Sequence, residues 1–191
     1  MMSRDELKQL AREQIKGNIG ILFVCMLIIG LITSAVSFTV VGTIVLAPVF
    51  SVSMVRIYLN LTKGRIPEIQ DIFSGFDILV KAIILNLVMG LFIMLWALLF
   101  YIPGIIKAIS YSMSTYILVE NPEMSPTEAI NESKRMMDGH KMDFFILMLS
   151  FLPWILLTMV TCGIAAIYVG PYMAATTANF YLDLKQQKSF D

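Results

Sequence analysis

The sequence predicts an all-α polytopic membrane protein with six transmembrane helices, arranged as three repeated hairpins that each follow a short interfacial amphipathic helix. Its 191 residues are 58% hydrophobic and only 15% charged, whereas a soluble domain is typically ~45–50% apolar and ~25% charged. A water-soluble fold of this size cannot bury so many apolar side chains. The composition therefore excludes a soluble enzyme, a nucleic-acid-binding domain and a disordered chain.

Long charge-free stretches divide the chain into pairs of spans. Residues 17–55 and 144–182 include no charged side chain, and Lys107 is the only one within residues 82–119. One spanning helix needs ~20 apolar residues, with ~25 as the usual upper limit, so each stretch suits two helices. Breaks near the middle lie at Gly42, Pro103-Gly104 and Cys162-Gly163. The predicted spans are 19–40, 42–62, 78–101, 103–119, 142–162 and 164–184.

The distribution of basic residues predicts the orientation in the membrane. All but one of the 14 Lys and Arg residues lie in the termini and in the connectors between hairpins, which are the segments 1–18, 56–81, 134–141 and 185–188. The turns on the opposite side, 38–44, 100–104 and 161–165, carry no charge. The positive-inside rule then places both termini and both long connectors in the cytoplasm of a cell-membrane protein.

A short amphipathic segment precedes each hairpin. The first opens with the capping-box pattern Ser3-x-x-Glu6. The second begins at Ile66-Pro67 and the third at Ser125-Pro126, where proline suits the first turn of a helix. Two interpretations stay open. These helices lie along the cytoplasmic interface with the apolar side toward lipid, or they are solvated connectors packed on the bundle.

These elements form a unit that recurs three times within a single membrane domain, residues 1–191. Ser51-Val52-Ser53-Met54 aligns with Ser110-Tyr111-Ser112-Met113, and the same spacing relates Pro67 to Pro126. The predicted units are 1–62, 63–119 and 120–184, followed by a short tail, 185–191. Repeats that run in the same direction about an axis along the membrane normal are known in transporters. Chance matching of small residues is the alternative.

Polar side chains within the second helices of the hairpins are the candidate functional groups. The repeat alignment places Ser53, Ser112 and Thr176 in one layer and Arg56, Thr115 and Asn179 in the next. These six residues, three apart on each helix, would share one face and form a polar seam that opens to the cytoplasm. The alternative is hydrogen bonding between helices, which contributes ~0.6–2 kcal/mol per contact in bilayers.

Two cations inside predicted spans have competing interpretations. Arg56 lies near the cytoplasmic end of its helix, where it can extend to the interface or pair with Asp183 or Glu120 inside the bundle. Lys107 lies about one turn below the outer end of its helix. It either extends to the outer headgroups or forms a cation site at the outer mouth of a central path.

Nothing in the sequence indicates an enzyme. Motifs of the types G-x-S-x-G and H-E-x-x-H are absent, as are paired carboxylates inside the spans. One histidine and two cysteines make a multi-ligand zinc site or a disulfide scaffold unexpected. Asp77 and Lys81 have the spacing of an ion pair on one helix. We therefore expect no catalytic residue, no metal and no cofactor.

Several local motifs along the chain carry a family resemblance. They include Ile15-Lys16-Gly17-Asn18, Ile72-Phe73-Ser74-Gly75-Phe76, Tyr101-Ile102-Pro103-Gly104, Glu120-Asn121-Pro122, Gly139-His140-Lys141 and Pro171-Tyr172. With these motifs the chain resembles domain-of-unknown-function family 975, an uncharacterised family of bacterial integral membrane proteins. More distantly it is similar to the membrane domain of some glycerophosphodiester phosphodiesterases. The resemblance implies a six-span helical protein and supplies no reaction and no catalytic residues.

Two classes of function follow. The first is a non-enzymatic module that binds or moves a lipid-like or small hydrophobic ligand, or that supports membrane stress or immunity-type protection. The second is a scaffold that recruits partner proteins through its cytoplasmic interfacial helices. A solvent-reaching cavity lined by Ser53, Arg56, Ser112 and Thr115 would favour the first class, and a dry, tightly packed centre would favour the second. The expected surroundings are the lipid bilayer, without nucleic acid.

Overall fold

A computed structural model describes residues 2–36, 40–99 and 101–188, and all regular secondary structure in these ranges is helical. The elements are α1 (Arg4–Ile15), α2 (Ile19–Val36), α3 (Val40–Thr62), the 3-10 helix η1 (Ile69–Ile78), α4 (Leu79–Leu99), α5 (Tyr101–Tyr111), α6 (Ser114–Glu120), α7 (Pro126–Met136), α8 (Lys141–Leu149), α9 (Leu152–Val160) and α10 (Ala166–Lys188). The expected all-α class is confirmed.

Four helical segments of the described chain are long and apolar enough to cross a membrane. They are Ile19–Val36, Ile44–Thr62, Ile69–Trp96 and Lys141–Val160. The predicted spans 103–119 and 164–184 are not among them. The first of these is divided by a turn between α5 and α6. The second lies in α10, which is long enough but carries several polar side chains in its C-terminal half.

The short helices begin as capped structures. Ser3 Oγ accepts a hydrogen bond from the backbone N–H of Glu6, and the Glu6 carboxylate accepts one from the backbone N–H of Ser3. These bonds from Ser3 hold the pKa of the Glu6 carboxyl below its usual value. Ser125 and Glu128 form the same reciprocal pair at the start of α7. The second segment differs from the prediction, because η1 begins at Ile69, after the expected Ile66-Pro67 start.

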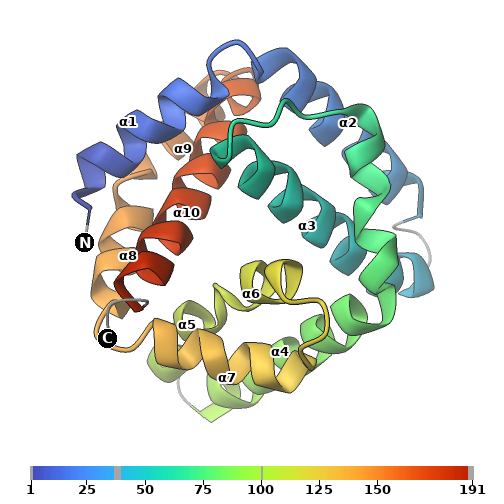
Figure 1. The fold of residues 1–191 in the computed structure, drawn as a ribbon, viewed down its shortest axis with the longest axis vertical. Coiled ribbons are helices and arrows are strands. Elements are labelled where there is room, and N and C mark those ends of the chain that lie inside the picture. The colour runs from blue at the N-terminus through green and yellow to red at the C-terminus, as the bar shows by residue number, and fades with distance from the viewer. Residues whose placement is uncertain (1, 37–39, 100, 189–191) are drawn as a thin grey trace.

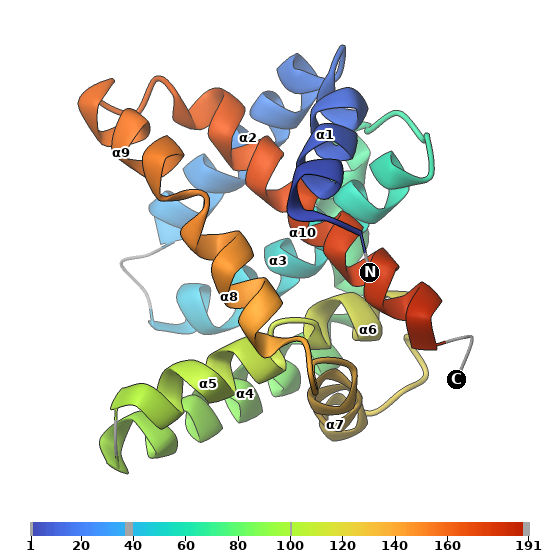
Figure 2. The ribbon, with the colours of Figure 1, turned by 90° about the vertical axis from the view of Figure 1, so that its left-hand side faces the viewer.

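Three helices occupy the centre of the molecule and the others surround them. In Figure 1 the inner helices are α3, α6 and α10, while α1, α2, α4, α5, α7, α8 and α9 lie outside them. Figure 2 shows the fold from the side. The far ends of α4, α5 and α9 point to one side, and α1, α7 and the C-terminal end of α10 lie toward the other. The short helices therefore share one end of the bundle.

The helices pack in a closed order around this centre. The short helices pack on longer ones in a regular pattern: η1 packs on α3, α7 packs on α5 and α6, and α1 packs on α10. The first two pack on helices that precede them in the chain, whereas α1 packs on the last helix. The helix that starts each hairpin follows the same order, since α2 contacts α3 and α10, α4 contacts α5 and α3, and α8 contacts α5. The start of the chain is thereby joined to its end.

The apolar faces of α1 and α7 are buried within the protein. Leu7, Ala11 and Ile15 of α1 are buried, as are Ala129 and Ile130 of α7. Of the two interpretations, packing on the bundle is therefore the one observed for these helices, and their charged faces point outward. Helix η1 is different, because its outward face is apolar, with Ile69, Phe73 and Phe76 exposed.

Candidate functional site

Ser53 holds the short helix η1 against α3. Its side chain is fully buried. Its Oγ donates to the carbonyl of Val49, 3.2 Å away, and accepts from the backbone N–H of Gly75 at 2.9 Å. This contact gives a backbone N–H of η1 a hydrogen-bond acceptor inside the protein. A buried backbone donor needs such a partner, because no water can replace it.

At Gly75 the backbone of η1 lies close against the backbone of α3. A Cβ atom at this residue would lie 2.3 Å from the carbonyl oxygen of Val49 and 2.7 Å from Ser53 Oγ. Real Cβ atoms do not reach such distances, and the first neighbour is backbone that cannot move aside. Glycine is required here because two backbones are in contact.

Arg56 makes a second contact between α3 and η1. Its Nη1 and Nη2 donate to the two carboxylate oxygens of Asp77 at 2.9 and 3.3 Å, and Nη1 also donates to the carbonyl of Ser74 at 2.5 Å. The expected partners Asp183 and Glu120 are wrong. The Asp77–Lys81 pair is wrong as well, since Lys81 Nζ donates to a backbone carbonyl beyond α6. Because the Asp77 side chain is 56% exposed, this ion pair adds little stability by itself.

Asn179 of α10 holds the short helix α1 against its own helix. Its Nδ2 donates to Gln14 Oε1 at 2.8 Å, while Gln14 Nε2 donates to Asn179 Oδ1 at 3.0 Å. Thr176, one turn earlier and fully buried, donates to the carbonyl of Tyr172 within its own helix. The reciprocal amide pair joins residues far apart in the sequence and closes the ring of helices.

Substitution of Asn179 by leucine should lower the free energy of unfolding by about 1–2 kcal/mol, because Gln14 is left without its partner inside the protein. The double change Gln14→Leu and Asn179→Leu should recover most of this loss, since both amides are then removed together. Thermal unfolding of the two single variants and the double variant in detergent measures this coupling. Additive losses would contradict the pairing.

The middle hairpin uses different residues for its contact with α7. Ser133 Oγ of α7 donates to the carbonyl of Ser110 at 2.8 Å, and both serines are buried. Ser112 lies in the turn after α5 and donates to the carbonyl of Ile109, and Thr115 is half-buried in α6. The turn between α5 and α6 shifts the register, so the aligned position does not meet the short helix.

The six predicted seam residues are thus distributed over separate local contacts. Ser53 and Arg56 meet η1, Asn179 meets α1, and Ser112 and Thr176 bond within their own segments. Within the described ranges no hydrogen bond joins any two of the six. Ser53, Arg56 and Asn179 hold short helices on the inner helices.

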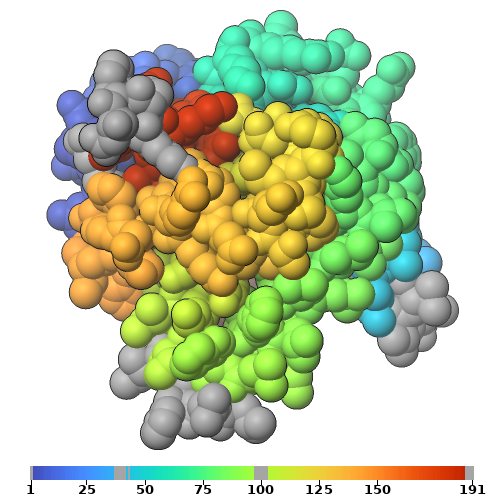
Figure 3. Space-filling view, turned by 60° about the horizontal axis from the view of Figure 1, so that its bottom comes forward, coloured from blue at the N-terminus to red at the C-terminus, as the bar shows by residue number. Residues whose placement is uncertain are grey.

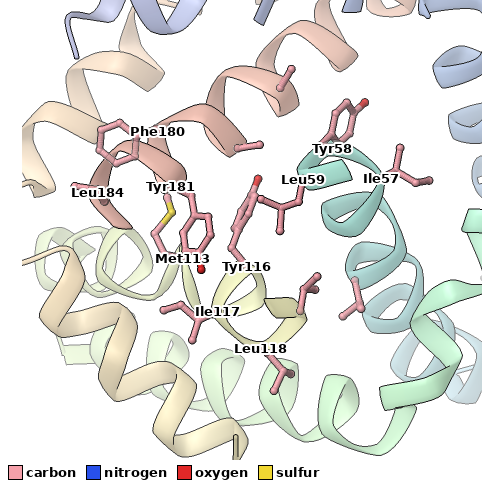
Figure 4. Close-up of a cluster of buried hydrophobic side chains, with 14 of the residues drawn as sticks. Ile57, Tyr58, Leu59, Met113, Tyr116, Ile117, Leu118, Phe180, Tyr181 and Leu184 are labelled. Carbon is pink, nitrogen blue, oxygen red and sulfur yellow. The ribbon is translucent and has the colours of Figure 1, made fainter. Parts of the chain in front are cut away.

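Aromatic side chains fill the centre where the seam was expected. Tyr58 of α3, Tyr116 of α6 and Tyr181 of α10 are 3%, 8% and 1% exposed. Figure 4 shows them together with Leu59 and Met113 between the three inner helices. The rings of Tyr116 and Tyr181 stack with centroids 5.3 Å apart. This packing leaves the inner helices in direct contact with one another.

Glu120, at the end of α6, joins this helix to α10 and to the residue that follows α3, a role that the sequence motifs do not predict. Its carboxylate, 11% exposed, accepts hydrogen bonds from Tyr181 Oη at 2.8 Å, Lys185 Nζ at 2.5 Å and Lys63 Nζ at 3.2 Å. Burial alone would raise the pKa of this carboxyl, but the bonds from Lys185, Tyr181 and Lys63 outweigh it and lower the pKa. A basic residue shortly after Tyr58 and another after Tyr181 were the available signal.

Lys107 of α5 contacts an aromatic ring of α4. Its Nζ lies 4.8 Å from the centroid of the Trp96 ring, between α5 and α4. The side chain is half-buried. A cation over the face of a tryptophan is stabilised electrostatically, so Lys107 has a partner in its own hairpin.

An apolar groove runs between α5 and α8. It has a volume of about 310 Å³ and is lined by Ile105, Ile106, Ile109, Met142 and Phe145, with Lys141 at its edge. Figure 3 shows this side of the molecule, where the orange atoms of α8 adjoin the yellow-green atoms of α5. Volumes of this size are at the lower end of those that hold small ligands. Among the described residues no three His, Cys, Asp or Glu side chains form a metal-binding group.

The fold and these sites define an all-helical protein whose apolar helices suit a membrane. The chain matches the family described as Protein of unknown function (DUF975) over residues 1–110 and again over residues 98–188. Since the matches together cover nearly the whole chain, it belongs to this family. No curated protein and no solved structure matches it, so the more distant similarity to glycerophosphodiester phosphodiesterases is not shown.

Proposed function

We propose that the chain crosses the cell membrane six times, as three repeated hairpins in the units 1–62, 63–119 and 120–184, with both termini in the cytoplasm. The closed packing order supports the repeat, because each short helix occupies the same place relative to the preceding hairpin. The pair α5–α6 and the long helix α10 supply the two spans beyond the four apolar segments. The basic residues gather at the end of the bundle that holds the short helices, which the positive-inside rule assigns to the cytoplasm.

Within this topology we propose that the protein is a non-enzymatic module that binds a lipid-like hydrophobic ligand at its lipid-facing surface. The groove between α5 and α8 is the observation that carries the proposal. Its lining is entirely aliphatic, aromatic or thioether apart from Lys141. Ile106 is 46% exposed and Phe145 is 42% exposed. An acyl chain fills such a groove and keeps the membrane-facing side chains in van der Waals contact.

The packed centre argues for a peripheral site over a central path. Three stacked or buried tyrosines and their aliphatic neighbours occupy the space between the inner helices. On these helices Ser53 and Asn179 are bonded to short helices, and Thr176 is bonded to its own backbone. A ligand moving along the axis would have to break these contacts, whereas one entering the groove from the bilayer displaces only lipid.

Filling the groove tests this proposal. The variant Ile106→Trp should reduce by more than half the lipid retained per protein after detergent extraction, because the indole occupies the place of the ligand. Ile84→Trp is the matched control, since Ile84 is similarly exposed but lies on α4 outside the groove. Native mass spectrometry of both variants counts the bound lipids. Equal retention in Ile106→Trp, Ile84→Trp and the wild type would contradict the proposed function.

The scaffold is the second candidate, and the outward faces of the short helices favour it. A shallow hollow of about 500 Å³ on α7 is lined by Glu123, Glu128, Glu132, Asn131 and Arg135. Its acidic character suits a partner with basic residues. In a strain where deletion of the gene has an effect, the scaffold predicts that Ile106→Trp restores function and that the double change Glu123→Lys and Glu132→Lys does not. The lipid-binding proposal predicts the reverse.

A further inference from the structure

A separate cavity lies on the other side of α8, among α1, α8 and α10. Its volume is about 310 Å³, and its lining includes Arg4, Leu7, Asp143, Ile146, Leu147 and Phe180. None of these residues lines the groove between α5 and α8. Helix α8 therefore has a cavity on each flank, and the two differ in chemistry.

The floor of this cavity is apolar. Leu7 of α1, Leu147 of α8 and Phe180 of α10 are each no more than 1% exposed and belong to the main hydrophobic core. Met2 and Ile146, both half-buried, complete the apolar part of the lining and are its accessible part. At ~30 Å³ for each water-sized group, the cavity holds about ten non-hydrogen atoms. A cavity of this size holds a segment of a lipid chain with part of its glycerol. It is too small to hold part of a partner protein.

Two residues of the lining, Arg4 and Asp143, carry opposite charges. Arg4 is in the first turn of α1 and Asp143 is in the first turn of α8, so both lie at the cytoplasmic end of the proposed bundle. No ion pair joins them in the part of the chain that the structure describes. Asp143 has His140 Nδ1 at 3.5 Å as a neighbour, and its side chain is 51% exposed. Both charged groups are thus accessible to a ligand at headgroup depth.

We propose that this cavity binds a zwitterionic phospholipid with a primary ammonium in its headgroup. The guanidinium of Arg4 attracts the phosphate, the carboxylate of Asp143 attracts the ammonium, and the chain contacts the half-buried side chains of Met2 and Ile146. An anionic lipid would meet repulsion from Asp143, and an uncharged hydrophobic ligand would leave both charges unused. The site is independent of the groove between α5 and α8.

Lipid competition tests the headgroup preference. The purified protein in nanodiscs that contain equal amounts of phosphatidylethanolamine and phosphatidylglycerol is released and analysed by native mass spectrometry. The wild type should retain the ethanolamine lipid in excess. Asp143→Asn should lower the ratio of ethanolamine to glycerol lipid at least fivefold, because only the phosphate contact is left. Arg4→Gln should reduce retention of the ethanolamine lipid without increasing that of the glycerol lipid.

Three further arms separate this site from general lipid binding. Exchange of the two charges, Arg4→Asp with Asp143→Arg, should restore the ethanolamine preference, which excludes a folding defect as the cause. Glu123→Gln, at an exposed residue that lines neither of the two cavities beside α8, should leave the ratio unchanged. Soluble phosphoethanolamine at hundredfold excess should not displace the lipid, because it lacks the chain that fills the apolar floor.

The proposal is overturned if Asp143→Asn has the wild-type ratio of the two lipids, or if Glu123→Gln changes that ratio as much as Asp143→Asn does. Displacement by soluble phosphoethanolamine overturns the role of the apolar floor. These outcomes are distinct from failure of the groove proposal, which is measured by Ile106→Trp and by the total lipid retained.

Discussion

Replacement of Gly75 by alanine should destabilise the protein strongly, although it adds only one methyl group. The added Cβ would lie 2.3 Å from the backbone carbonyl oxygen of Val49 and 2.7 Å from Ser53 Oγ. Overpacking of a close contact typically costs 1–3 kcal/mol, occasionally more, and here η1 must also give up its hydrogen bond to Ser53. We expect a loss of about 3 kcal/mol, or a melting temperature lower by ~6–12 °C for a chain of this length.

Gly90→Ala is the matched control for this substitution. Gly90 lies inside α4 with no atom within 4 Å of an added Cβ. Alanine is the better helix former by up to ~1 kcal/mol, so this variant should be as stable as the wild type or slightly more stable. Melting curves of both variants in the same detergent provide the measurement. Equal stability of Gly75→Ala and Gly90→Ala would contradict the close contact between η1 and α3.

Glu120→Ala should give the second large effect, a loss of about 2–3 kcal/mol at neutral pH. The substitution removes the acceptor of the buried Tyr181 hydroxyl and of two ammonium groups, and hydrogen bonds to a charged group contribute ~1.5–3 kcal/mol. Lys63 and Lys185 are more than half exposed, so water screens their share. Most of the loss should come from Tyr181, whose hydroxyl is left unpaired.

The effect of Glu120→Ala should also depend on pH. The folded protein lowers the pKa of this carboxyl below the value of 4.5 expected in the unfolded chain. A depressed pKa stabilises the fold fully above the unfolded value, and this contribution is lost as the pH falls through the folded pKa. The difference in melting temperature between wild type and variant should therefore be constant above about pH 5.5 and shrink below 4.5. Glu123→Ala, at an exposed residue, should show neither the loss nor the pH dependence.

The sequence predicts the helical class, the capped short helices and the end of the bundle to which they belong. These features can be predicted because the length of an apolar stretch and the position of charges are visible in short segments of the chain. The sequence does not predict which helices meet. The contact of Arg56 with Asp77, and that of Gln14 with Asn179, depend on the closed packing order. The aligned position Ser112 also misses its partner, because the turn after α5 moves Tyr116 into line with Tyr58 and Tyr181.

The candidate ligand sites are less visible in the sequence than the fold. The groove and the cavity beside α8 are formed by apolar side chains and a few charged ones from helices far apart in the chain. Such residues are indistinguishable from other membrane-facing ones until the helices are placed. Glu120 is similar, because its importance comes from the convergence of Lys63, Tyr181 and Lys185 on one carboxylate.

Cysteine accessibility in intact cells is the most direct test of the proposed six-span topology. Gln9→Cys in α1, Gln70→Cys in η1 and Thr127→Cys in α7 place single reporters on exposed residues of each short helix, in a background lacking both native cysteines. The native Cys162, which is exposed, is the reporter for the opposite side in a Cys25→Ser background. The six-span account predicts that a membrane-impermeant maleimide labels Cys162 and reaches the three short helices only after the membrane is opened. If only the four most apolar segments crossed, position 127 would be labelled from outside and Cys162 would be protected, and that pattern would contradict the account.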